Sequence, residues 1–206
     1  MSDLQLKRAL RLKGMASLDV LRGAVRMSEA DVRAGLQALV SGGLARETPR
    51  GCMLLPPGRE QLAAELAAER AAIDGARAEA AYARFVELNA GFKALMRDWQ
   101  IRSVGGTDQP NDHADAAYDA AVVARLVEID AKLAPLLAEI AAIAPRLAVY
   151  APRFADALAA LRGGDRSMMA APIRDSYHTV WFELHEELID LCGRTRAQEA
   201  AEGRGD

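Results

Sequence analysis

The chain has 206 residues, of which 51% are hydrophobic, 27% are charged and only 5% are aromatic, and its formal net charge is −3. A chain this long and this apolar buries a sizeable core, which excludes a disordered or collagen-like polymer and leaves one or two globular domains. Its 43 alanines and its scarcity of β-branched residues favour helix, so we expect a mostly α fold.

The sequence predicts a cytoplasmic protein without a membrane partner. Its first residues lack the uninterrupted apolar core of an export signal, and no stretch approaches the ~20 apolar residues that cross a bilayer. Cys52 and Cys192 lack the spacing of a metal or redox motif, so we expect both thiols to be reduced.

Charge is distributed unevenly along the chain. Residues 1–59 contain ten Lys and Arg against five Asp and Glu, a balance of +5, whereas residues 60–206 contain 16 against 24, a balance of −8. A basic N-terminal third on an acidic protein suggests a polyanion-binding module joined to a domain that does not bind polyanions. We expect these domains at residues 1–72 and 73–206, with a disordered tail near 195–206.

Three short helices are predicted at the N-terminus. A run of leucines among basic residues predicts the first helix, and Gly14 ends it as a glycine cap would. Ser17 begins the second helix, and Ser28 begins the third with acidic residues in the first turn. The apolar residues of the third helix make one buried stripe, and Arg33 and Gln37 lie outside it.

A β-hairpin is predicted directly after these helices. Residues 44–48 and 52–55 are short strand candidates, and the triplet Pro49-Arg50-Gly51 between them is typical of a turn. Arg50 is therefore expected at the tip of the hairpin. Three short helices followed by a hairpin is the element order of a winged helix-turn-helix.

The stretch from Gly43 to Leu62, GLARETPRGCMLLPPGREQL, resembles the signature of MarR-like and PadR-like bacterial regulators: glycine, leucine, wing, leucine, threonine, any residue, glycine. The resemblance covers about residues 4–70. Pro56 stands where many members have threonine, so the cap of the helix that follows is expected to differ. The resemblance implies a winged-helix fold and double-stranded DNA as the partner.

In this resemblance the third helix enters the major groove of DNA. Arg33 and Gln37 would read base edges, and Arg50 on the wing would reach the backbone or the minor groove. The other basic residues of the module would contact phosphates, namely Arg8, Arg11, Arg22, Arg26 and Arg46. Because the reading face is rich in alanine, the alternative is a protein-docking or accessory module of a metabolic enzyme system, without DNA binding.

The acidic part of the chain is predicted to be a helical bundle. A loop is expected around Gly105, Gly106 and Pro110, and Pro135 is expected to kink or end its helix. The helices are expected at residues 59–74, 76–100, 112–135, 145–162 and 172–192.

Polar and aromatic residues gather on inner faces of this bundle. On the last helix His178, Trp181 and His185 share one face, whereas Glu183 and Glu187 lie on the opposite side. Three interpretations stay open for the histidines: hydrogen-bonded core residues, a pocket for an effector, or a metal site. The candidate effector residues are Asn89, Trp99, Arg102, His113, Tyr118, Tyr177, His178, Trp181 and His185.

The sequence lacks a Gly-rich phosphate loop, a nucleophile elbow and a cysteine beside a histidine, so we expect no enzyme, no cofactor and no assigned metal ligands. We predict a DNA-binding transcriptional regulator that responds to a small-molecule effector. A homodimer is expected because paired modules match symmetric operators.

Overall fold

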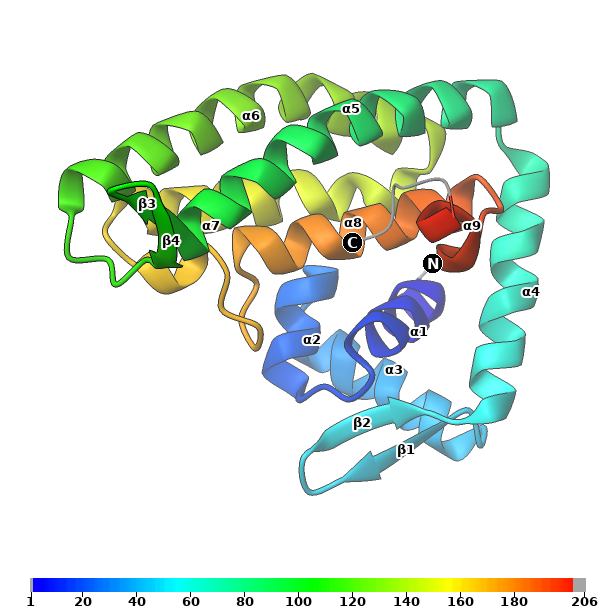
Figure 1. Cartoon of the computed structure of the whole chain (residues 1–206). Coiled ribbons are helices and arrows are strands. Elements are labelled where there is room, and N and C mark those ends of the chain that lie inside the picture. Colours follow the sequence, from blue (N-terminus) through cyan, green and yellow to red (C-terminus); the bar gives the residue numbers. More distant parts are fainter. Residues whose placement is uncertain (1, 202–206) are drawn as a thin grey trace.

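The structure is a computed structural model and describes residues 2–201. It confirms the predicted fold class, because it is mostly helical with a short β-hairpin after the N-terminal helices. Figure 1 shows two parts, which we call the N-terminal unit (residues 2–72) and the bundle (residues 75–201). Each part has its own cluster of buried hydrophobic residues.

The N-terminal unit contains three helices, a two-stranded hairpin and a long fourth helix. Ser17 and Ser28 cap α2 and α3 with their side chains, as their positions in the sequence predicted. The buried face of α3 is formed by Val32 and Leu39, which leaves its other side exposed. The elements are α1 (Ser2–Lys13), α2 (Leu18–Val25), α3 (Glu29–Ser41), β1 (Ala45–Thr48), β2 (Gly51–Leu54) and α4 (Pro56–Ala72).

The hairpin is anchored to the segment that connects α1 to α2. β1 and β2 pair antiparallel, and Cys52 also forms an isolated bridge with Ala16. Gly51 has a φ of +136°, and an added Cβ would lie 2.4 Å from the Ala16 carbonyl oxygen, so only glycine fits here. After the hairpin, α4 begins at Pro56 with no side-chain cap from Leu55, in line with the different cap expected there.

The bundle contains more elements than the sequence predicted. Residues 101–110 form a second hairpin where a loop was expected, and Pro135 lies inside a continuous 28-residue helix without ending it. The elements are α5 (Gly75–Gln100), β3 (Ile101–Val104), β4 (Thr107–Pro110), α6 (Ala116–Ile143), η1 (Pro145–Val149), α7 (Tyr150–Arg162), η2 (Arg166–Met168), α8 (Tyr177–Leu191) and α9 (Arg196–Ala201).

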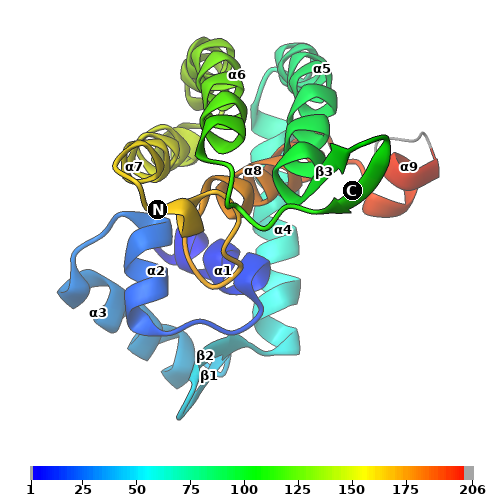
Figure 2. The ribbon, with the colours of Figure 1, turned by 60° about the vertical axis from the view of Figure 1, so that its left-hand side comes forward.

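The helices are arranged in layers, and α8 lies in the middle layer. Figures 1 and 2 show α5 and α6 on one side of α7 and α8, and the N-terminal unit on the other side. The long helix α4 runs along one edge and connects the two parts (Figure 1). Because α8 is covered from both sides, ten of its fifteen residues are buried.

The end of the chain differs from the predicted tail. Residues 196–201 form the helix α9, and Glu199 of this helix is fully buried, with an oxygen that accepts a hydrogen bond from the Tyr82 hydroxyl. The remaining predicted tail residues, 202–206, lie outside the described residues. Within residues 2–201, no helix combines the length and the hydrophobicity that a bilayer crossing needs.

Candidate functional site

The outer face of α3 carries the two predicted base-reading residues. Arg33 and Gln37 are both exposed on this helix. The Arg33 guanidinium lies 2.8 Å from the Glu29 carboxylate one turn earlier, and 65% of the Arg33 side chain is exposed. An exposed ion pair at this spacing contributes only about 0.3–0.5 kcal/mol, so an anionic ligand can replace Glu29 at small free-energy cost.

Arg50 lies at the tip of the first hairpin and is exposed, as predicted. The turn is held by Thr48, whose hydroxyl donates to the Gly51 carbonyl at 2.8 Å and accepts from the Arg50 N–H at 3.3 Å. Figure 1 shows this hairpin at the end of the molecule opposite α5 and α6. The wing is therefore a rigid projection with a cation at its tip.

A groove of about 420 Å³ separates α3 from the hairpin. Its apolar floor includes Leu18, Leu36 and Val40, and its polar residues include Arg33 and Gln37. The two predicted reading residues thus share one concave surface with the wing.

Three arginines that were predicted to contact phosphate lie at the surface, and each contacts another side chain of the protein. Arg22 lies 3.4 Å from the Asp19 carboxylate, and Arg46 lies 3.7 Å from the Met53 sulfur. Arg26 forms an ion pair with Asp156 of α7, so this arginine already joins the N-terminal unit to the bundle.

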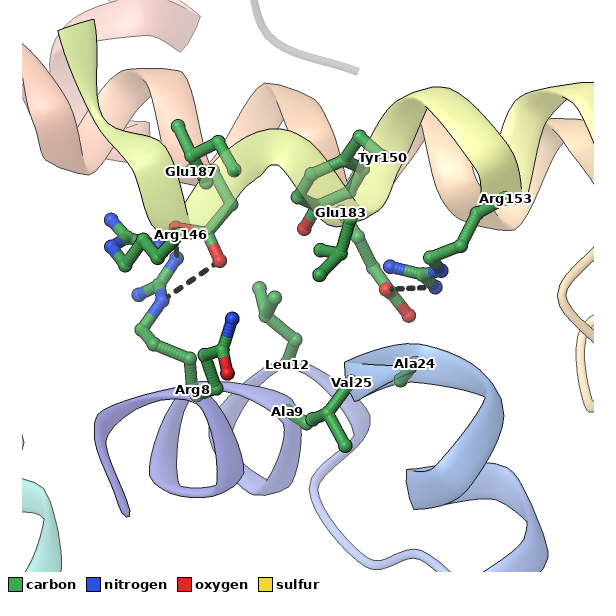
Figure 3. Close-up of a pocket in the computed structure, with 13 residues that line it drawn as sticks. Arg8, Ala9, Leu12, Ala24, Val25, Arg146, Tyr150, Arg153, Glu183 and Glu187 are labelled. Atoms are coloured by element: carbon green, nitrogen blue, oxygen red, sulfur yellow. Dashed lines mark hydrogen bonds and ion pairs between the residues drawn. The ribbon is translucent and has the colours of Figure 1, made fainter. Parts of the chain in front are cut away.

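The structure contradicts the phosphate-binding prediction for Arg8. Its side chain is only 3% exposed, and its guanidinium lies 2.8 Å from Glu187 (Figure 3) and 2.5 Å from Asp190, both on α8. Arg11 also reaches Asp190, at 3.2 Å, although 39% of its side chain stays exposed. The leucine stripe of α1 did not reveal that its basic side is buried against a second domain.

A first buried ion cluster surrounds Glu187. Arg146 from η1 contacts Glu187 and also lies 2.8 Å from Glu69 of α4. Burial alone would raise the pKa of Glu187, but the charges of Arg8 and Arg146 outweigh burial and lower it below its ordinary value. Three parts of the chain, α1, η1 and α4, are thereby joined to α8.

A second buried cluster surrounds Glu183, one helical turn earlier on α8. Lys13 at the end of α1 lies 2.7 Å from Glu183, and Arg153 of α7 lies 2.6 Å from the same carboxylate. Asp175 contacts both cations at 2.9 Å. A cavity of about 30 Å³, which is room for a water molecule, lies between the clusters. Figure 3 shows Tyr150 among the residues that line it.

Several basic residues of the N-terminal third are paired with carboxylates of the chain itself. Arg8 and Lys13 neutralise carboxylates of the bundle, and the buried Lys7 lies 2.6 Å from Glu65 of α4. Part of the charge asymmetry along the sequence therefore holds the two parts together, and only the exposed arginines remain for an external polyanion.

The predicted effector residues fall into two separate groups. Tyr177 and His185 are fully buried core residues; Tyr177 donates to Asp130 at 2.9 Å, and His185 packs on Phe85 with ring centroids 5.3 Å apart. Three further members line a pocket between α5 and α8, namely Asn89, His178 and Trp181.

The other group lies beside the second hairpin. The ring of His113 packs on Trp99 at a tilt of 41° with centroids 4.4 Å apart, and Arg102 lies 5.2 Å from the Tyr118 ring centroid. The nine candidates therefore do not form one pocket.

The sequence analysis missed two residues that hold His113 in place. The His113 Nδ1 lies 3.1 Å from both carboxylate oxygens of Asp119, and Asn111 donates to Asp119 at 3.0 Å. These contacts hold His113 at a φ of +59°, which is rare for a residue with a side chain. The sequence did contain a signal for Asp119, because it is a charged residue on the same helix face as the apolar Val122.

Among residues 2–201, no three His, Cys, Asp or Glu side chains are placed to hold a metal ion together. Comparisons with protein-family models, with curated proteins and with solved structures find no match to this chain.

Proposed function

We propose that the chain is a DNA-binding transcriptional regulator whose contacts come from α3 and the first hairpin. The observation that supports this proposal is the outer face of α3, with the exposed Arg33 and Gln37, beside a wing whose tip carries the exposed Arg50, while the basic side of α1 is buried against the bundle. A helix that presents polar side chains beside a projecting wing suits a major groove and its flanking backbone.

In this proposal the contacts differ in kind. Gln37 and Arg33 read base edges, because amide and guanidinium groups can make two hydrogen bonds to one base. Arg50 contacts the backbone and gives salt dependence without sequence preference, and Arg22 and Arg46 add phosphate contacts. A homodimer would place two such units on a symmetric operator, and a small molecule bound in the bundle would change their spacing.

The experiment is an electrophoretic mobility shift with the full chain and the promoter fragment of its own gene. We expect a shift that weakens as salt rises, and a loss of affinity in Arg33→Ala because that variant removes a base contact worth about 1–3 kcal/mol. Arg84→Ala on α5 is the matched control, since Arg84 is an exposed arginine in an ion pair with Glu139 of the bundle. Equal binding by wild type and Arg33→Ala would remove the assigned role of α3.

A second candidate is a protein-docking module without DNA binding, and one observation favours it. The first turn of α3 carries Glu29 and Asp31, both exposed, which repel phosphate, and the groove floor beside the helix is apolar. If this alternative holds, the chain gives no mobility shift at low salt, and Leu36→Glu in the groove abolishes binding to a protein partner.

A further inference from the structure

A pocket of about 280 Å³ lies between the second half of α5 and the first half of α8. It opens into a larger hollow of about 680 Å³, because Gln100, His178 and Phe182 line both. None of the nine residues that line the smaller pocket is acidic, namely Asn89, Phe92, Lys93, Met96, Arg97, Gln100, His178, Trp181 and Phe182.

The largely buried Asn89 brings a hydrogen-bond donor to the lining of this pocket. Asn89 is 4% exposed, and its side-chain oxygen accepts a hydrogen bond from the Trp181 indole N–H at 2.8 Å. Because an indole N–H can only donate, the partner atom must be the amide oxygen, and this leaves the Asn89 NH₂ group for other contacts. Within residues 2–201 that NH₂ group has no acceptor. A donor that lines a pocket and has no protein acceptor can donate to a ligand that brings an acceptor.

The walls of the pocket are flat rings. Phe92 and Trp181 stack with ring centroids 4.1 Å apart and an angle of 17° between their planes. Phe182 is 40% exposed, which is high for so large an apolar side chain. Phe92 and Trp181 are each only 2% exposed, so a ligand ring would cover chiefly Phe182, and removing that apolar surface from water would stabilise the complex.

The rim of the pocket is cationic. Lys93 and Arg97 lie one turn apart on α5, on the same side as Asn89, and both are exposed. Arg97 lies 2.6 Å from Asp108 of the second hairpin, in an ion pair whose two side chains are more than half exposed. Such a pair is weak in water, so a bound anion can compete for the guanidinium.

We propose that this pocket binds a flat, ring-bearing organic anion. The ring covers Phe182 beside the nearly buried Phe92 and Trp181, the anionic group meets Lys93 and Arg97, and an acceptor atom accepts from the Asn89 NH₂ group. The anionic group can be a phosphate or a carboxylate, since both accept from these donors. The regulatory role of such a ligand rests on the proposed function, whereas binding itself does not.

The adjoining hollow gives the ligand a route to the N-terminal unit. Met15, Val20 and Arg50 line that hollow from one side, and Ile173 and Phe182 line it from the other. A ligand that extends out of the pocket would contact both parts of the chain, including the wing residue Arg50. It would therefore favour one relative placement of the wing.

The test is isothermal titration calorimetry of the full chain with adenosine 5′-monophosphate, benzoate and inorganic phosphate as separate probes. We expect at least one ring-bearing probe to bind more tightly than inorganic phosphate; the tighter of the two tells whether the site prefers phosphate or carboxylate. In Asn89→Asp the oxygen still accepts from Trp181, but the donors are replaced by a negative charge. We expect on the order of tenfold weaker binding in this variant and in Lys93→Glu.

Lys132→Glu on α6 is the matched control, since Lys132 is an exposed lysine that does not line the pocket, and it should bind the probe like wild type. If Asn89→Asp unfolds, the exposed Lys93→Glu carries the test alone. The proposal is overturned if neither ring-bearing probe binds, if inorganic phosphate binds equally well, or if Lys93→Glu binds like wild type. A chain that binds DNA but no probe overturns this proposal alone, and a chain that binds a probe but no DNA overturns only the proposed function.

Discussion

Arg8 on α1 and Glu187 on α8 are separated by 179 residues in the sequence, yet their side chains meet at 2.8 Å, both less than 5% exposed. This ion pair lies at the contact between the N-terminal unit and the bundle (Figure 3). Charges removed from water are favourable only while they are paired, so the contact has a defined geometry with little tolerance for the loss of one partner.

Removal of Arg8 should therefore destabilise the whole chain. Arg8→Met leaves Glu187 buried with Arg146 as its remaining close cation, and we expect a loss of about 3 kcal/mol in the free energy of unfolding. Urea denaturation measures it. The double variant Arg8→Met, Glu187→Leu removes both charges and should recover most of the loss. An Arg8→Met protein as stable as wild type would show that the pair does not join the two parts.

The lowered pKa of Glu187 predicts how stability depends on pH. The native state holds this carboxylate ionised at pH values where the unfolded chain takes up a proton, so the stabilisation is complete above the ordinary carboxyl pKa of about 4. It is lost as pH falls through the native pKa. Asp175 contributes in the same direction, because Arg153 and Lys13 outweigh its burial and lower its pKa.

Thermal denaturation from pH 7 to pH 3 tests this dependence with Glu187→Gln. Wild type should be clearly more stable than the variant near neutrality, and the two melting temperatures should converge as acid protonates Glu187, which then resembles glutamine. A difference that stays constant over the whole range would contradict the assignment.

The wing should depend on the glycine after its tip. Gly51→Ala forces a side chain onto a φ of +136° and toward the Ala16 carbonyl, and we expect a loss of about 1–3 kcal/mol in unfolding free energy. Gly91→Ala on α5 is the control, because no atom lies within 4 Å of its added Cβ, and it should stabilise by about 1 kcal/mol. Equal effects of the two changes in chemical denaturation would rule out the tight approach at Gly51.

The contact with Asp119 should stabilise the unfavourable backbone conformation of His113. His113→Ala removes the Nδ1 partner of a carboxylate that is 6% exposed, and we expect a loss of about 1–3 kcal/mol. His113→Asn should be milder, because asparagine tolerates a positive φ and can donate to the carboxylate. Differential scanning calorimetry compares the two, and a milder effect of alanine than of asparagine would contradict this account.

Local patterns predicted the N-terminal unit well, because its elements are specified by nearby residues. Ser28 caps α3 as expected, and the Pro49-Arg50-Gly51 triplet forms the turn of the hairpin. The second hairpin was missed, since residues 107–110 are exposed throughout and lack the alternating apolar pattern of a half-buried strand.

The candidate sites were harder to predict, because helical periodicity identifies the two faces of a helix but not what covers each of them. On α8 it separated Trp181 from Glu183 correctly, yet Glu183 is buried against Lys13 and Arg153. The same limit explains Arg8. Its position on α1 suits a phosphate contact equally well until the bundle is placed beside it.

The salt dependence of DNA binding tests the proposed function most directly. Fluorescence anisotropy with the full chain and the promoter duplex, over roughly 50 to 200 mM salt, should give a linear fall of log affinity with log salt. Arg50→Ala should reduce that slope by about 1, the contribution of a single phosphate contact, whereas Arg84→Ala should leave it unchanged. No binding at the lowest salt, or the same slope in Arg50→Ala as in wild type, would contradict DNA recognition by α3 and the wing.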